Sequence, residues 1–143
     1  MPPTTIAGTG PARPVDPAEL GLDVRTNVLV RARDGVDLSV NLLLPLGAAA
    51  PLPAILNTDP YRKDDWSAGW DLSLAAYFAE RGYAYARLDV RGTGSSGGVA
   101  LDEYTEDETR DGHDVVEWLA AQPWCSGSVG MWGLSYGGFT SIQ

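Results

Sequence analysis

Five consecutive residues, Gly133-Leu134-Ser135-Tyr136-Gly137, carry the clearest chemical signal in the chain, and we refer to them as the serine turn. They match G-x-S-x-G, a pattern that presents a serine hydroxyl on a sharp turn between a strand and a helix. Residues 129–132, just before them, are mostly apolar and predict a short buried strand. We expect a helix to begin directly after the serine. This context favours a nucleophilic serine over a glycine-rich turn without chemistry.

A nucleophilic serine at such a turn needs room and electrostatic support. Side chains at Gly133 and Gly137 would collide across the turn, so glycine is expected at both positions, and Gly138 extends the clearance. The backbone N–H of Tyr136 is expected to donate to the oxygen that becomes negative, where the helix N-terminus adds positive potential. A general base and an orienting carboxylate are also required, and in this arrangement they follow the serine. No aspartate, glutamate or histidine follows Ser135.

The chain has one histidine, His113, in a helix that we predict between Thr105 and Gln122. Because the base follows the serine in this arrangement, we interpret His113 as a structural or surface residue. Acidic residues gather near the start of the same helix, where they favour the helix dipole and show no spacing typical of a cation site. We interpret them as a solvated helix start and expect no metal; they are Asp102, Glu103, Glu106, Asp107, Glu108, Asp111 and Asp114.

A glycine-rich loop follows the strand that we predict to end near Val90. Asp89 and Arg91 could form an ion pair in an active site, but we favour the interpretation that they pin this loop, residues 92–94. The loop lacks the lysine of a phosphate-binding P-loop. We therefore expect this loop not to bind phosphate. We also expect no cofactor.

We favour structural roles for the cysteine and for most of the tryptophans. Nothing near Cys125 marks it as a nucleophile, so we interpret it as a small packed residue. The tryptophans are expected mainly in the core. The alternative for Trp66 and Trp70 is that they line an acyl pocket, because they follow closely on the loop at residues 57–65.

Composition limits the classes of partner. The chain has 143 residues, 44% hydrophobic and 20% charged, which suits one domain with a sizeable core. The formal net charge of −9, from 10 basic and 19 acidic residues, argues against nucleic acid or an anionic membrane as partner. A single cysteine excludes an internal disulfide. No apolar run suits a membrane span and residues 1–20 lack a signal-peptide pattern, so we expect a cytoplasmic protein.

A β-hairpin is expected at the start of the ordered chain. Asp34-Gly35 separates two segments of alternating polar and apolar residues, which predicts an antiparallel hairpin with one buried face. The expected inward positions are Val24, Thr26, Val28, Val30 and Ala32 on the first strand and Val36, Leu38, Val40, Leu42 and Leu44 on the second.

The apolar runs further along predict parallel strands. Residues 54–56, 83–90 and 129–132 are near-continuous apolar runs with helical patterns between them, which suits strands covered on both faces. The sequence therefore predicts an α/β fold over residues 22–143, parallel apart from the hairpin. We expect residues 1–21 to form a flexible lead-in.

Three stretches, in order, closely resemble one enzyme family. Residues 57–65 (Asn-Thr-Asp-Pro-Tyr-Arg-Lys-Asp-Asp) follow the third predicted strand, residues 89–98 follow the fourth, and residues 118–125 lead into residues 130–139 around the serine. They resemble the CocE/NonD hydrolases, the group of cocaine esterase, α-amino-acid ester hydrolases, cephalosporin acylases and X-prolyl dipeptidyl peptidases. The resemblance covers about residues 24–143.

The resemblance implies an α/β-hydrolase fold with Ser135 as nucleophile. The tyrosine of the family's Pro-Tyr loop donates its hydroxyl to the oxyanion, and this position is Tyr61; without the family, Tyr61 reads as a packing tyrosine. The second donor is the backbone N–H of Tyr136. We expect a serine hydrolase that acts on a small ester, amide or short peptide through an acyl-enzyme, with X-prolyl dipeptidyl-peptidase-like activity in its range.

The resemblance also implies parts that these residues do not contain. The family has an inserted helical cap, a C-terminal jelly-roll domain, and a catalytic acid and histidine after the serine. We therefore expect the chain to be the N-terminal part of the sheet. The alternative function is a catalytically incompetent fragment or a pseudoenzyme with an interaction role, with the strand before Ser135 as an exposed edge.

Overall fold

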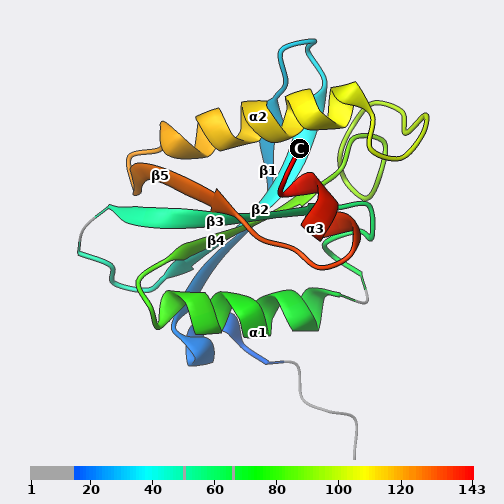
Figure 1. Ribbon diagram of the computed structural model, residues 1–143. Coiled ribbons are helices and arrows are strands. Elements are labelled where there is room, and N and C mark those ends of the chain that lie inside the picture. The colour runs from blue at the N-terminus through cyan, green and yellow to red at the C-terminus, as the bar shows by residue number, and fades with distance from the viewer. Residues whose placement is uncertain (1–14, 50, 66) are drawn as a thin grey trace, which may run out of the picture.

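The computed structural model describes residues 15–49, 51–65 and 67–143, which form a five-stranded sheet with a helix over each face (Figure 1). The strands are β1 (Leu22–Arg31), β2 (Asp37–Pro45), β3 (Leu52–Asp59), β4 (Ala84–Asp89) and β5 (Cys125–Met131). The helices are α1 (Ala68–Ala79), α2 (Glu106–Ala120) and the short α3 (Tyr136–Thr140), with a 3-10 helix η1 at Pro17–Leu20. The predicted order of hairpin, strand, helix, strand, helix, strand, turn and helix is confirmed.

The sheet topology gathers the sequence motifs at one end of the molecule. The strand order is β1-β2-β4-β3-β5, with β1, β2 and β4 antiparallel in turn and β4, β3 and β5 parallel. Because the last three strands run in the same direction, their carboxyl ends at Asp59, Asp89 and Met131 reach the same edge. The loops after these strands carry the three family-like motifs. Within the described residues β5 is an edge strand, as expected.

A β-bulge in β1 changes which face its residues occupy. Between Arg25 and Val28, β1 has one residue more than its partner β2, and Asn27 in this bulge has φ 53°. Val24 therefore packs on the α1 side of the sheet, whereas Val28 and Val30 pack on the α2 side. The prediction of a single inward face for β1 is wrong, because one extra residue reverses the alternation of a strand.

The second hairpin strand, β2, is buried on both faces. Val40 and Leu42 pack on the α2 side, while Leu43 packs on the α1 side. Ser39 and Asn41 alternate with the predicted inward positions and so were expected on the exposed face, but they are 0% and 8% exposed. The predicted single buried face is wrong here because β4 pairs with β2 and places it inside the sheet, where α1 covers the second face.

Helices α1 and α2 close the two faces (Figure 1). α2 buries Val115 and Leu119 against the larger apolar cluster, and α1 buries Ala75 in the smaller one. Thr105 is the N-cap of α2, and its Oγ1 accepts a hydrogen bond from the N–H of Glu108 at 3.3 Å. The predicted start of this helix is confirmed.

The N-terminal segment is only partly described. Residues 1–14 of the predicted lead-in lie outside the described residues, while Pro17–Leu20 forms η1 with Asp16 as its N-cap. The domain boundary at residue 22 stays a prediction. In the described part of the chain, no helix combines the length and the apolar character needed to cross a membrane.

Candidate active site

The serine turn has the backbone geometry that G-x-S-x-G predicts. Ser135 has φ 56° and ψ −118°, uncommon for a residue with a side chain, and directly precedes α3. A Cβ at Gly133 would lie 2.2 Å from the carbonyl carbon of Gly137, and one at Gly137 would lie 3.2 Å from Asn57 Oδ1. A residue strained in this way costs about 1–3 kcal/mol and persists only where its surroundings enforce it. The glycine at 133 is therefore a steric requirement of the turn.

Ser135 and Tyr61 line one cavity of about 500 Å³ at the carboxyl ends of the strands. Trp70, Trp132 and Leu134 give it apolar walls. Its other lining residues are polar, namely Asn57, Asp59, Ser67, Asp71 and Arg87. A volume of this size with a few converging polar groups is typical of a small-molecule site. The structure thus brings together two of the predicted site residues that lie far apart in the sequence.

The tryptophans divide between the two interpretations. Trp70 lines the cavity and is 62% exposed, so the expectation of a core residue is wrong for it. Trp66 lies outside the described residues.

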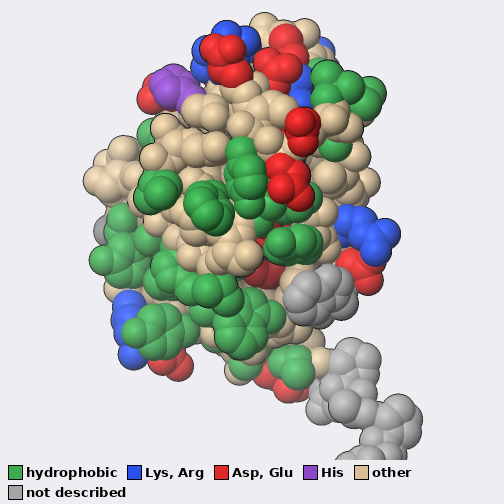
Figure 2. Space-filling view, turned by 45° about the vertical axis from the view of Figure 1, so that its right-hand side comes forward, with side chains coloured by type: hydrophobic (Ala, Val, Ile, Leu, Met, Phe, Trp, Pro, Cys, Tyr) green, Lys and Arg blue, Asp and Glu red, His purple; other side chains and the backbone are tan. Residues whose placement is uncertain are grey.

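The end of the molecule that carries the cavity is rich in apolar side chains. Figure 2 brings this end forward, and hydrophobic side chains gather over much of it. Leu134 and Phe139, on either side of the serine, are 78% and 58% exposed. Exposed apolar side chains gathered beside a cavity are typical of a binding region.

The floor of the cavity is a buried charge network centred on Arg87. Its guanidinium donates to Asp71 (Nε to Oδ2, 3.0 Å), to Asn57 (Nη1 to Oδ1, 3.0 Å) and to Asp59 (Nη2 to Oδ1, 2.6 Å). The same oxygen of Asp59 accepts the backbone N–H of Tyr61 at 2.9 Å. Arg87 therefore holds the backbone of Tyr61 through Asp59.

This network was not predicted from the sequence. Burial raises the pKa of Asp71 above its ordinary value, and the neighbouring charge of Arg87 offsets the effect only in part. The available signal was Arg87 itself, which interrupts the apolar run at residues 83–90. A charge in a strand covered on both faces must have buried partners.

A second buried network lies under the Tyr61 loop, residues 60–65. Lys63 is 2% exposed. Its Nζ donates to Asn27 at 2.8 Å, Asp64 at 2.9 Å and Asp89 at 3.1 Å, and its backbone N–H donates to Asp89 Oδ1 at 2.7 Å. The bulge in β1 brings the side chain of Asn27 into this network. Two other parts of the chain, β1 through Asn27 and the end of β4 through Asp89, thus fix the loop that carries Tyr61.

Asp89 and Arg91 act on different neighbours. Asp89 also accepts the backbone N–H of Ser95 at 2.9 Å, so the interpretation that it pins the glycine-rich loop is confirmed. Arg91 pairs with Asp111 at 2.6 Å and Asp34 at 3.0 Å, which ties the base of the loop to α2 and to the hairpin turn.

The interpretation of the acidic cluster as a solvated helix start is wrong for two of its residues. Glu108 and Asp111 are 8% and 3% exposed. Asp111 pairs with Arg91, and Glu108 Oε2 accepts the hydroxyl of Tyr136 at 2.7 Å. Positions 108 and 111 share one helical face with the buried Val115 and Leu119. From this spacing the burial of both acids could have been predicted.

His113 lies away from the serine. Its side chain is 65% exposed on α2, and its Nδ1 is 3.3 Å from Arg33 Nη2. It lines a different cavity from that of Ser135. Its interpretation as a surface residue is confirmed, as is that of Cys125 as a small packed residue, 8% exposed.

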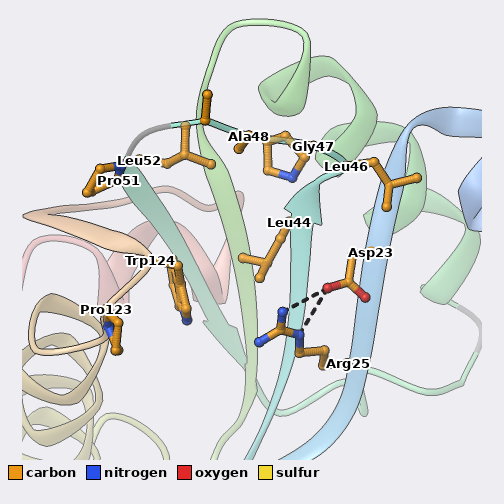
Figure 3. A pocket seen from close by; sticks show the side chains of 12 residues that line it. Asp23, Arg25, Leu44, Leu46, Gly47, Ala48, Pro51, Leu52, Pro123 and Trp124 are labelled. Carbon is orange, nitrogen blue, oxygen red and sulfur yellow. Dashed lines mark hydrogen bonds and ion pairs between the residues drawn. The ribbon is translucent and has the colours of Figure 1, made fainter.

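A further cavity of about 410 Å³ lies at the opposite end of the sheet (Figure 3). Leu44, Leu52 and Trp124 line it, and the ion pair of Asp23 with Arg25 at 2.9 Å forms one wall. Among its described lining residues none is a serine, cysteine or histidine. The candidate nucleophile Ser135 lies in the other cavity, at the carboxyl ends of the parallel strands.

Comparison with known proteins agrees with this geometry. The family model for X-Pro dipeptidyl-peptidases (S15 family) matches residues 34–143, a range that includes the Tyr61 loop and the serine turn. The chain belongs to the S15 family. This S15 chain is 40% identical over 122 residues to the cocaine esterase of Rhodococcus sp. (strain MB1 Bresler), a match that covers 84% of the chain and 21% of the esterase. It spans about a fifth of the length of the curated relatives it matches.

Solved structures share the fold of the S15 chain. An α-amino acid ester hydrolase matches with 31% identity and a TM-score of 0.70 over 98% of the chain and 25% of the hydrolase. A CocE/NonD family hydrolase from Staphylococcus aureus matches with 24% identity and a TM-score of 0.72 over 83% of the chain and 24% of the hydrolase. The predicted α/β-hydrolase fold and the resemblance to CocE/NonD hydrolases are confirmed.

Proposed function

We propose that this protein is a serine hydrolase that cleaves ester or amide bonds through an acyl-enzyme on Ser135. The observation that carries the proposal is a strained serine, φ 56°, in a cavity that it shares with Tyr61. Membership of the S15 family and the likeness to a cocaine esterase support it.

In the proposed mechanism Ser135 Oγ attacks the substrate carbonyl carbon while its proton passes to a base. The hydroxyl of Tyr61 and the backbone N–H of Tyr136 donate to the resulting oxyanion. The leaving alcohol or amine takes the proton, and water then releases the acid from the acyl-enzyme. His113 is a poor base for this step because it lines another cavity. We propose that the base and its carboxylate partner belong to a longer protein.

Active-site labelling tests the nucleophile. A fluorophosphonate probe should label the full-length protein, and Ser135→Ala should abolish labelling and turnover together. Ser141→Ala is the matched control, since Ser141 is the C-cap of α3, its Oγ donates to the carbonyl of Gly137 at 2.6 Å, and it does not line the cavity. Labelling that survives in Ser135→Ala would overturn the assignment.

Tyr61→Phe tests the hydroxyl donor. Loss of one oxyanion donor lowers kcat by about 10²–10³-fold, so we expect this drop in the full-length enzyme with little change in KM. Tyr77→Phe, which alters an exposed tyrosine on α1, is the control. An unchanged kcat in Tyr61→Phe would remove Tyr61 from the mechanism.

The substrate range is a finer part of the proposal. Esters, amides and short peptides with an X-Pro sequence are the expected classes, by analogy with the family. Turnover of a p-nitrophenyl ester and of an X-Pro p-nitroanilide should both depend on Ser135. Cleavage of the ester alone would contradict the peptidase-like part and leave the hydrolase intact.

A second candidate concerns residues 1–143 taken alone, as an inactive fragment. Because the one histidine of this sequence lies away from Ser135, we expect no turnover above a Ser135→Ala control when these residues are expressed by themselves. Serine-dependent turnover would refute this expectation.

A further inference from the structure

The side chain of Tyr136 is directed away from the cavity toward α2. Its hydroxyl donates to Glu108 Oε2 at 2.7 Å, and the residue is 5% exposed. The backbone N–H of Tyr104 also donates to the same hydroxyl, at 3.2 Å. The residue whose backbone follows the nucleophile is therefore anchored at the far end of its side chain.

Aromatic contacts hold the ring of Tyr136 on two further sides. The ring of Tyr104 stacks on it, with centroids 4.3 Å apart and planes at 25°. The ring of Tyr61 meets it edge-on, with centroids 6.4 Å apart and planes at 72°. Tyr104 itself has φ 56°, a conformation that persists only where its surroundings enforce it. The two residues proposed to supply oxyanion donors, Tyr61 and Tyr136, are thus in contact through their rings.

The side chain of Glu108 bonds to a distant residue and not to the N-cap of its own helix. A glutamate three residues after a threonine N-cap commonly reaches back to the N-cap N–H. Here the carboxylate of Glu108 instead binds a residue 28 positions away. Burial raises its pKa above the ordinary value. A partly desolvated carboxylate is costly, and the bond from Glu108 to Tyr136 beside the serine turn points to a role in geometry.

We propose that Glu108 is a positioning residue for the oxyanion hole, which it orients through the hydroxyl of Tyr136. The inference rests on the proposed hydrolase function. Tying down the tyrosine hydroxyl fixes the ring and with it the orientation of the Tyr136 backbone N–H. Donors to a developing oxyanion must lie within a few tenths of an ångström of their working position to be effective.

Kinetics of the full-length enzyme test the inference with Glu108→Ala, Glu108→Gln and Tyr136→Phe. Glu108→Ala and Tyr136→Phe should each lower kcat by about tenfold to a hundredfold with KM within about twofold, as for a misplaced donor. A boronic acid that mimics the tetrahedral intermediate should bind more weakly by a similar factor. Glu108→Gln should recover most of kcat, because its amide oxygen still accepts the tyrosine hydroxyl. The double variant should be no worse than either single variant, since the two act as one unit.

Glu106→Ala is the matched control, because Glu106 is an acid in the same helical turn with a 78% exposed side chain. It should leave kcat and boronic acid binding unchanged. Tyr136→Phe keeps the ring and removes only the hydroxyl, so it tests the inference even if Glu108→Ala does not fold. An unchanged kcat in Tyr136→Phe, or a Glu108→Gln variant as slow as Glu108→Ala, would overturn the positioning role. Failure of the hydrolase proposal itself would show separately, as activity that persists in Ser135→Ala.

Discussion

The serine turn and the Tyr61 loop flank one cavity but are held in place by different means. Each contains a non-glycine residue in the left-handed region, Ser135 with φ 56° and Arg62 with φ 63°. In the serine turn the main constraint is local, because the backbones of Gly133 and Gly137 lie so close that no side chain fits at Gly133. In the Tyr61 loop the constraint comes from elsewhere in the fold.

Charged and polar partners far away in the sequence hold the Tyr61 loop. The bonds from Lys63 to Asp89 and Asn27 and from Arg87 to Asp59 span 26, 36 and 28 residues. A buried ion pair fixes its partners firmly, because removal of either leaves an uncompensated charge. Similar backbone strain is therefore enforced in two ways: by steric exclusion within five residues in the serine turn, and by charge complementarity across the sheet in the Tyr61 loop.

The largest expected effect on catalysis comes from breaking the local constraint in the serine turn. In Gly133→Ala the new Cβ would lie 2.2 Å from Gly137, so the turn must open by about 1 Å. We expect kcat of the full-length enzyme to fall by about 10²-fold or more, with a loss of stability of about 3 kcal/mol. In Gly138→Ala the Cβ would lie 3.4 Å from the carbonyl oxygen of Gly133, and activity should stay within about threefold of wild type. Equal losses in both variants would show that the turn is not limited by this contact.

The next effect comes from breaking the remote constraint. Lys63→Met keeps much of the buried stem but removes the ammonium, so Asp89 is left without its charge partner. We expect a loss of about 3–5 kcal/mol in the free energy of unfolding, measured by urea denaturation of the full-length protein. Arg31→Met removes an exposed pair with Asp37 and should cost at most about 1 kcal/mol. A small loss in Lys63→Met would mean that the loop is held by its local sequence after all.

A third prediction asks whether the serine turn also carries a remote, charge-dependent contribution. Burial raises the pKa of Glu108 above its ordinary value of 4.5, so the folded protein keeps this proton to higher pH than the unfolded chain. The corresponding stability is present below the unfolded pKa and is lost as the pH rises through the raised folded pKa. The unfolding free energy of wild type minus that of Glu108→Gln should therefore decrease as the pH rises above 4.5 and through the raised folded pKa. A difference that increases over this range would contradict the assigned direction.

The smallest expected effect concerns Ser67, two residues after the end of the Tyr61 loop. Among the described residues, Ser67 Oγ is the buried side-chain polar atom that has no hydrogen-bond partner. Ser67 precedes α1 without capping it through its side chain. We expect Ser67→Ala to be neutral or to stabilise the protein by up to about 1 kcal/mol, since no bond is lost. Ser73→Ala is the control, because Ser73 Oγ donates to the carbonyl of Gly69 at 3.1 Å. A clear loss of stability in Ser67→Ala would point to a bond that this hydroxyl makes in solution.

Patterns confined to one segment predicted the fold well. The hairpin at Asp34-Gly35, the three parallel strands and the capped start of α2 at Thr105 follow from turn chemistry, apolar runs and a helix cap, and all are present. The predictions failed where contacts between distant segments determine which face of the sheet a residue occupies. Val24 faces the other side from Val28 because of a bulge whose Asn27 bonds to Lys63, 36 residues away.

The features of the candidate site also fall into those that follow from local sequence and those that depend on distant contacts. Ser135 and the glycine at 133 follow from the sequence alone, because the collision that requires glycine lies within the five-residue turn. Only the tertiary structure decided that Ser135 and Tyr61 share a cavity. It also decided which residues Arg87 and Glu108 contact. Buried charges take their partners from whichever strands the topology brings together, and no local pattern specifies those partners.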